Sequence, residues 1–123
     1  IAYGLSWPER IESGAAALDF HALGGLSFEP IDADGHRERF PGLALAWEAL
    51  RAAPGTCAVL NAANEVAVDA FLQRRIRFDQ IHAVNRATLD AEAPGAPGDL
   101  AALLELDHRA RAAALACVRR LAG

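Results

Sequence analysis

Residues 58–72 read AVLNAANEVAVDAFL. If this stretch is a helix, apolar side chains surround most of its circumference, which is typical of a helix buried inside a protein. Four polar residues interrupt the pattern and share one face at spacing i, i+3, i+4 and i+8, namely Asn61, Asn64, Glu65 and Asp69. Buried polar groups need hydrogen-bond partners, so we expect this polar stripe to meet polar groups inside the protein or across an interface.

A further helix is predicted before this stretch, from about Pro41 to the break at Pro54-Gly55. Proline is tolerated in the first turn of a helix, whereas Pro-Gly is a turn signal. Leu43, Trp47 and Leu50 share one face of this helix, at spacing i, i+4 and i+7. Either Gly55 or Thr56 is expected to cap the long helix that follows.

Helices are also predicted after the long helix. Asp79 is expected to cap one that ends before the loop PGAPG at 94–98 and turns Ile81, Val84 and Thr88 inward. Asp99 is then expected to cap a short turn, and Asp107 a final helix. The predicted buried stripe of that helix is Ala110, Ala114, Cys117, Val118 and Leu121. Short connections between amphipathic helices predict a mainly α fold, an antiparallel bundle of about four helices over residues 41–123.

Residues 1–40 have a different character. Residues 6–10, SWPER, predict a turn or a helix start, because proline is favoured at the first helical position. Residues 26–30, LSFEP, alternate apolar and polar side chains as a short half-buried strand does. One strand of this length is not stable alone, and the chain offers no good second strand. Residues 1–40 are therefore expected to need a sheet from elsewhere.

Composition excludes some classes of partner. The 123 residues carry a net charge of −4, all 12 basic residues are Arg, and no basic run is longer than Arg74-Arg75. This gives no electrostatic basis for binding nucleic acid, and no apolar stretch is long enough to span a membrane. Cys57 and Cys117 are expected to be buried free thiols in a reducing cytosol, with a disulfide between them as the open alternative.

Several motifs in a fixed order carry a resemblance to a known family. They are IAYGLSWPER at 1–10, LDF at 18–20, LSFE at 26–29, RFPGLALA at 39–46, LNAANE at 60–65, IRFDQI at 76–81, and LD followed by AR at 106–111. With these motifs the chain resembles the C-terminal region of 1-deoxy-D-xylulose 5-phosphate reductoisomerase over essentially its whole length. Only the segment 29–38 departs, because it is longer than the usual connection there.

The resemblance implies that this chain is about the last third of an enzyme. The absence of methionine and the start at Ile1 also suggest a piece of a longer protein. Such an enzyme would be a bacterial, cytoplasmic homodimer that converts a sugar phosphate to 2-C-methyl-D-erythritol 4-phosphate for isoprenoid synthesis, with NADPH and Mg²⁺ or Mn²⁺. Residues 1–40 would be the tail end of its central α/β catalytic domain and the connection, and 41–123 its C-terminal helical bundle.

No catalytic, cofactor-binding or metal-binding residue is expected on this chain. No G-x-G-x-x-G follows a strand, and no glycine-rich phosphate loop precedes a helix. Asp90-Ala91-Glu92 resembles the family's Asp-x-Glu metal motif, but it lies at a helix end that runs into a Pro/Gly loop. The four histidines lack the spacing of a zinc site. The chain alone is therefore expected to be inactive, with a structural role that supports the catalytic domain.

Two questions stay open at this level. Asn61, Asn64 and Glu65 either hydrogen-bond the catalytic domain or form a polar network within the bundle, where Arg10, Arg39 or Arg111 would balance Glu65. Trp7 either packs in a core or lies near the active-site wall. The alternative to a piece of the enzyme is an independent, non-catalytic helical interaction module.

Overall fold

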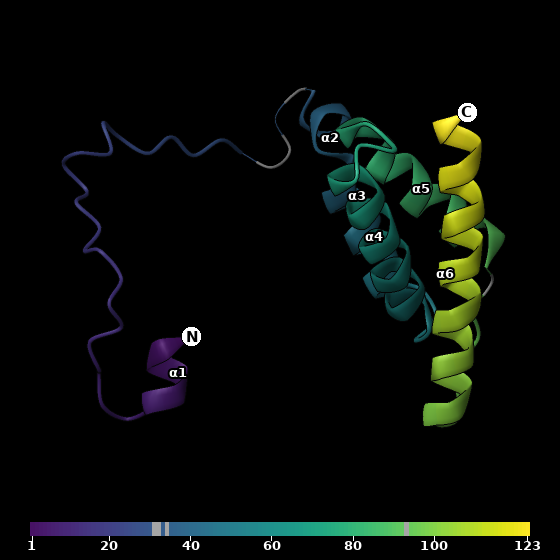
Figure 1. Cartoon of the computed structure of the whole chain (residues 1–123), viewed down its shortest axis with the longest axis horizontal. Coiled ribbons are helices and arrows are strands. Elements are labelled where there is room, and N and C mark those ends of the chain that lie inside the picture. The colour runs from purple at the N-terminus through teal and green to yellow at the C-terminus, as the bar shows by residue number, and fades with distance from the viewer. Residues whose placement is uncertain (31–32, 34, 93) are drawn as a thin grey trace. The chain divides into compact units, whose positions relative to one another are not determined.

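The computed structural model describes residues 1–30, 33, 35–92 and 94–123, and these contain helices but no β-strand (Figure 1). The helices are α1 (Ala2–Ser6), α2 (His36–Arg39), α3 (Pro41–Arg51), α4 (Thr56–Leu72), α5 (Phe78–Ala91) and α6 (Leu100–Ala122). The chain divides into two compact units, Ile1–Ile31 and Asp32–Gly123, which are described separately.

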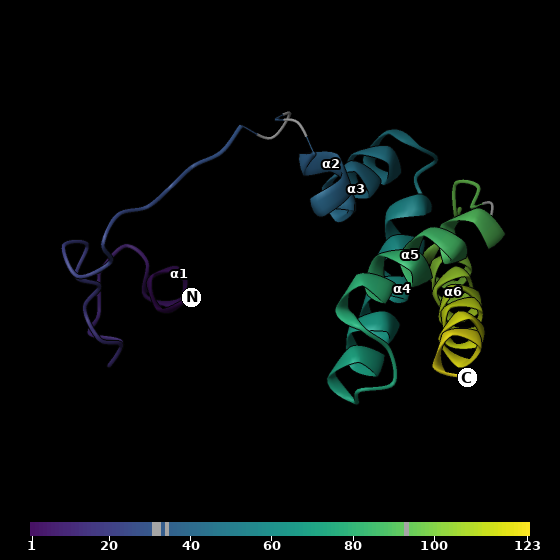
Figure 2. The same ribbon diagram turned by 90° about the horizontal axis from the view of Figure 1, so that it is seen from above.

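The second unit is a helical bundle, as predicted. Helices α4, α5 and α6 pack on one another, and α3 packs on α4 and α5 (Figure 2). Gly55, just before α4, lies against Leu106 near the start of α6, whereas Phe71 and Leu121 near the two helix ends line one hollow. The chain therefore runs up α4, down α5 and up α6, which makes α5 antiparallel to both of its neighbours.

Small side chains dominate the core of this bundle. Four alanines of α4 and two of α6 are at most 2% exposed, and the largest fully buried side chains are Val59, Val84, Val118 and Thr88. Alanine permits close approach of helices and has the highest helix propensity. The predicted inner face of α5 is confirmed, because Val84 and Thr88 are buried and Ile81 packs against the same cluster. The predicted stripe of α6 is confirmed too, with Leu121 only partly buried.

Leu43, Trp47 and Leu50 share one face of α3 as predicted, but it is not the face that the bundle buries. Leu43, Trp47 and Leu50 are exposed, and the buried residues of α3 are Leu45 and Ala49. The helix reads PGLALAWEALR and is apolar on two opposite faces. Periodicity shows which residues share a face, but it does not show which of two apolar faces the neighbouring helices cover.

The structure corrects or refines four predicted caps. Asp107 is not a cap, because α6 is one helix from Leu100 to Ala122 and residues 100–106 contain only good helix formers. Asp99 does cap it, since its Oδ1 accepts a hydrogen bond from the Ala102 N–H at 2.8 Å. Asp79 lies in the first turn of α5 rather than at its cap, which is Arg77. For α4 the N-cap is Gly55.

The first unit contains α1 and irregular chain. Residues 7 and 8 form the predicted turn after α1, with the Glu9 N–H donating to the Ser6 carbonyl at 3.0 Å, so the helix precedes Pro8 rather than starting there. Trp7 is 70% exposed and its ring lies 5.6 Å from that of Tyr3, so the prediction that it packs in a core is wrong for this chain.

Two predictions about residues 1–40 remain predictions. Residues 26–30 are in neither helix nor strand, and the described residues provide no second strand for them to pair with. The expected boundary between 40 and 41 falls inside the second unit, which already includes α2. Within the unusually long segment 29–38, positions 31, 32 and 34 lie outside the described residues.

Candidate functional site

The polar stripe lies on the solvent-facing side of α4, where Asn61, Asn64, Glu65 and Asp69 are all exposed. The expectation that α4 is buried almost all round is therefore wrong for this chain. Asn61 Nδ2 donates to Glu65 Oε1 at 3.1 Å, and Gln73 Nε2 donates to Asp69 Oδ2 at 2.7 Å. These bonds stay within α4 and its C-terminal end, so they order side chains along the stripe without joining helices.

Two other bonds of the stripe do join helices. Asn64 Oδ1 accepts from Asn85 Nδ2 of α5 at 3.1 Å, and Glu65 Oε2 accepts from Arg111 Nη2 of α6 at 2.7 Å. Of the three arginines considered as partners of Glu65, Arg111 is the one in contact. Its Nε also donates to Asp107 Oδ2 at 2.7 Å, so one guanidinium holds two carboxylates.

This arrangement shifts two pKa values. The hydrogen bond from Arg111 lowers the pKa of Glu65 from its ordinary value of 4.5, and the hydrogen bond from Asn61 adds to the effect. The carboxylates of Asp107 and Glu65 raise the pKa of Arg111 in turn. Glu65 and Arg111 are thus both ionised at neutral pH, and they form a charge-assisted hydrogen bond between α4 and α6.

Asn85 is the most buried member of this network, with 7% of its surface exposed. Its Oδ1 has no hydrogen-bond partner among the described residues, although its Nδ2 is satisfied by Asn64. A network within the bundle therefore exists, and it still leaves Asn61, Asn64 and Glu65 open to solvent. That these three residues contact another domain stays a prediction.

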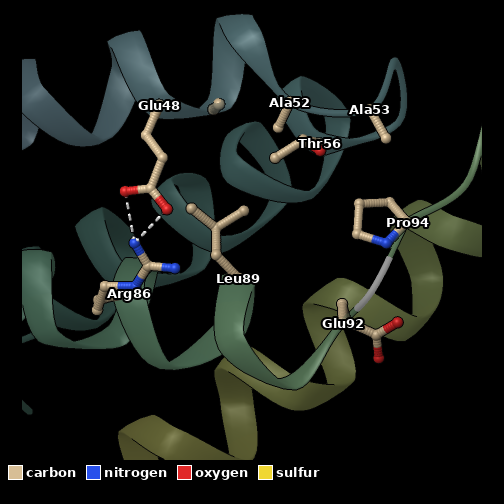
Figure 3. Close-up of a pocket in the computed structure, with 9 residues that line it drawn as sticks. Glu48, Ala52, Ala53, Thr56, Arg86, Leu89, Glu92 and Pro94 are labelled. Atoms are coloured by element: carbon tan, nitrogen blue, oxygen red, sulfur yellow. Dashed lines mark hydrogen bonds and ion pairs between the residues drawn. The ribbon is translucent and has the colours of Figure 1, made fainter.

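A hollow of about 290 Å³ lies between α3, the start of α4 and the end of α5 (Figure 3). The labelled side chains around it come from these elements and the following loop: Glu48, Ala52, Ala53, Thr56, Arg86, Leu89, Glu92 and Pro94. Arg86 Nη1 donates to both carboxylate oxygens of Glu48 at 2.8 Å, and Nη2 pairs with Asp90.

Ion pairs occupy the polar side chains around the hollow. The carboxylates of Glu48 and Asp90 raise the pKa of Arg86, whose guanidinium is shared between α3 and α5. Glu92, at the other end of the hollow, is paired with Arg109 at 3.4 Å. The polar groups there hold α3, α5 and α6 to one another, and no nucleophile with an adjacent base is among the lining residues. The side chains around the hollow thus take part in ion pairs that join helices.

The described residues do not fit a bound metal ion. They bring together no group of three His, Cys, Asp or Glu side chains, and Asp90 and Glu92 pair with different arginines. Cys57 and Cys117 are both free, so the disulfide is not formed. Cys117 is buried as predicted, whereas Cys57 is exposed. Among the described helices, none is both long and apolar enough to cross a membrane.

Sequence reasoning missed three of these contacts, for two different reasons. Arg86–Asp90 and Asp107–Arg111 have i, i+4 spacing, which is a recognisable signal for ion pairs on a helix. Glu48 and Arg86 are 38 residues apart, and no local pattern joins them.

The chain is similar to a known family model and to the sequences of known enzymes. A family model described as the C-terminal domain of DXP reductoisomerase matches residues 1–113. The 1-deoxy-D-xylulose 5-phosphate reductoisomerase of Ralstonia nicotianae is 55% identical over 111 residues, which are 90% of this chain and 27% of that protein. The protein of the same name from Cupriavidus metallidurans is 50% identical over 123 residues, 100% of this chain and 30% of its own length.

Solved structures show the same relationship. The Zymomonas mobilis reductoisomerase in complex with NADPH matches with a TM-score of 0.73 and 40% identity, over 95% of this chain and 30% of that one. A DOX-P reductoisomerase in complex with magnesium matches with a TM-score of 0.73 and 36% identity, over 99% and 32%. The chain thus spans less than a third of the length of these relatives.

Proposed function

The chain belongs to the DXP reductoisomerase C-terminal domain family, and from this we propose that it is the C-terminal part of an NADPH-dependent reductoisomerase. The whole enzyme converts 1-deoxy-D-xylulose 5-phosphate to 2-C-methyl-D-erythritol 4-phosphate in non-mevalonate isoprenoid synthesis. The observation that carries this proposal is the family match over residues 1–113, together with identities of 50% or more to reductoisomerases along nearly the whole chain.

The chemistry of this enzyme belongs to the part outside this chain. NADPH supplies a hydride, and Mg²⁺ or Mn²⁺ polarises substrate oxygens when bound. The described residues do not fit a metal ion, so no step of the reaction is assigned to them. Two of the solved relatives are complexes with NADPH and with magnesium, which supports these cofactors for the whole enzyme.

The role of this chain is to brace the catalytic domain. Its three long helices share an alanine-rich core, and ion pairs tie α3 to α5 and α4 to α6. Such a cross-linked bundle is a stiff support, and stiff supports hold catalytic groups in place to a fraction of an ångström. Asn61, Asn64 and Glu65 are candidates for polar contacts with the catalytic domain, because their outer sides are open.

Family membership also suggests how the whole enzyme assembles and where it acts. We propose a homodimer in the bacterial cytoplasm that binds its sugar phosphate through the part outside this chain. The free thiols of Cys57 and Cys117 agree with a reducing compartment.

The test compares this chain with the complete enzyme. With the substrate, NADPH and Mg²⁺ or Mn²⁺, the isolated chain should oxidise no NADPH, whereas the complete protein should do so in proportion to added substrate. Robust turnover by the isolated chain would show that the structural role is wrong. Lack of turnover by the complete protein would leave the alternative of an independent interaction module.

A further inference from the structure

One face of α3 is apolar and exposed. The exposed fractions are 53% for Phe40, 43% for Leu43, 49% for Trp47 and 64% for Leu50. At 100° per residue Leu43, Trp47 and Leu50 fall within one arc of the helix, and Leu45 and Ala49 lie on the opposite side. Phe40 directly precedes the helix as its N-cap residue. We call the set Phe40, Leu43, Trp47 and Leu50 the outer face of α3.

The opposite side of α3 packs against the other helices of the bundle. Leu45 is 3% exposed and Ala49 2%, and Glu48 is held by Arg86 of α5. A helix that is apolar on both sides is normally covered on both sides, since exposed apolar patches of this kind mark contact surfaces. Among the described residues of the second unit, none forms a layer that covers the outer face of α3.

Two arginines lie against the aromatic rings of this face. The Arg51 guanidinium is 5.2 Å from the centroid of the Trp47 ring, and that of Arg39 is 5.1 Å from the centroid of Phe40. Neither arginine forms an ion pair within the described residues. Tryptophan and arginine are enriched among the residues that contribute most to protein interfaces. The face therefore has an apolar centre and a cationic rim.

We propose that the outer face of α3 docks on the part of the same polypeptide that lies outside this chain, against an apolar patch rimmed by carboxylates. This rests on the proposed function, and it makes the apolar face of α3 the main contact in the bracing of the catalytic domain. The relatives are more than three times as long as the segment they share with this chain, so a large covering body belongs to the same molecule. Carboxylates at its rim would pair with Arg39 and Arg51.

The test is hydroxyl-radical footprinting of the complete protein, read residue by residue by mass spectrometry. A synthetic peptide of residues 38–52 gives the oxidation rate of each side chain when it is free. We expect Trp47 and Leu50 to be oxidised about tenfold more slowly in the complete protein than in the peptide. Protection of less than about twofold would overturn the proposal.

A matched pair of variants separates docking from general loosening. Leu50→Glu places a charge in the outer face, whereas Leu100→Glu does so at a similarly exposed leucine of α6, 69% against 64%. Leu50→Glu should raise the oxidation rate of Trp47 about fivefold or more, and Leu100→Glu should leave it within about twofold. An equal response to both variants would contradict the proposal.

Two further readouts distinguish the other outcomes. If protection of Trp47 disappears as the complete protein is diluted from dimer to monomer, a second copy covers the face and the proposal is wrong. NADPH oxidation is measured on the same preparation. An active enzyme with a fully reactive Trp47 would overturn the docking proposal alone, whereas an inactive protein with a protected Trp47 would overturn the proposed function and leave the docking intact.

Discussion

Glu65 of α4 accepts a hydrogen bond from Arg111 of α6, with 2.7 Å between Oε2 and Nη2. The two residues are 46 positions apart in the sequence, and the same guanidinium also holds Asp107. Glu65 belongs to the exposed polar stripe, so this ion pair lies at the edge of the contact between the two helices that share the most extensive packing. It predicts a dependence of stability on pH.

The Arg111 hydrogen bond lowers the pKa of Glu65 in the folded chain below its ordinary value of 4.5. The resulting stabilisation is complete above that value and is lost as pH falls through the lower pKa of the folded state. Glu65→Gln should therefore be less stable than the native chain at about pH 7, and the difference should shrink as the pH falls below 4.5. Urea unfolding followed by circular dichroism measures both.

Glu105→Gln is the control for this prediction, because Glu105 is exposed on α6 and forms no ion pair within the described residues. Its difference from the native chain should be small at neutral and at low pH. A loss for Glu65→Gln that is the same at low and neutral pH would contradict the ion-pair explanation.

Asn64→Ala should destabilise the chain by about 1–2 kcal/mol, because it removes the partner of a buried amide. Asn85 donates to Asn64 Oδ1 at 3.1 Å and is only 7% exposed. Asn61→Ala is the control, since among the described residues the Asn61 side chain bonds only to Glu65 on the same helix, and this change should cost less than about 0.5 kcal/mol. Urea midpoints give both values.

A double-mutant cycle sharpens this prediction. Asn85→Leu removes the buried amide, so in its presence Asn64→Ala should cost little, and the two changes should be non-additive. Simple additivity would show that Asn64 and Asn85 do not depend on each other for stability.

Gly55→Ala should destabilise the chain by about 1–3 kcal/mol through crowding. A Cβ at Gly55 would lie 2.7 Å from Leu106 Cδ2, 2.9 Å from the Gly95 carbonyl oxygen and 3.0 Å from Pro94 Cβ. Its φ of −73° suits any residue, so close approach rather than backbone conformation requires glycine here. Thermal unfolding of the purified variant measures the loss.

Gly42→Ala is the matched control, because a Cβ at Gly42 in α3 meets nothing within 4 Å. Alanine has the higher helix propensity, so this change should be neutral or should stabilise by up to about 1 kcal/mol. The prediction for Gly55 is wrong if the two variants melt at the same temperature.

Ala114→Leu should destabilise the bundle by about 1–3 kcal/mol, because the added atoms have no space in the packed core. Ala114 is fully buried in the cluster that joins α4, α5 and α6. Ala112 lies two residues earlier on the same helix and is exposed. Ala112→Leu should therefore change the free energy of unfolding by less than about 0.5 kcal/mol. Similar losses for both would mean that the core is not closely packed at Ala114.

Much of the bundle could be predicted from residues near one another in the sequence. The inner face of α5, with Val84 and Thr88, and the buried stripe of α6, with Ala114 and Val118, follow from a period of 3.6 residues. The family follows from short motifs in a fixed order, and the comparisons confirm it. Each of these features is encoded within a few helical turns, so local sequence is sufficient.

The remaining features depend on which segments meet in space. The sequence alone shows that α3 has two apolar faces, and only the packing of α4 and α5 selects Leu45 and Ala49 as the buried one. In the same way, the sequence offers three possible arginine partners for Glu65. Only the packing of α6 against α4 brings Arg111 Nη2 to 2.7 Å from Glu65 Oε2. Helical periodicity sets the direction of a side chain relative to its own axis, whereas burial and charge pairing depend on which other helix lies in that direction.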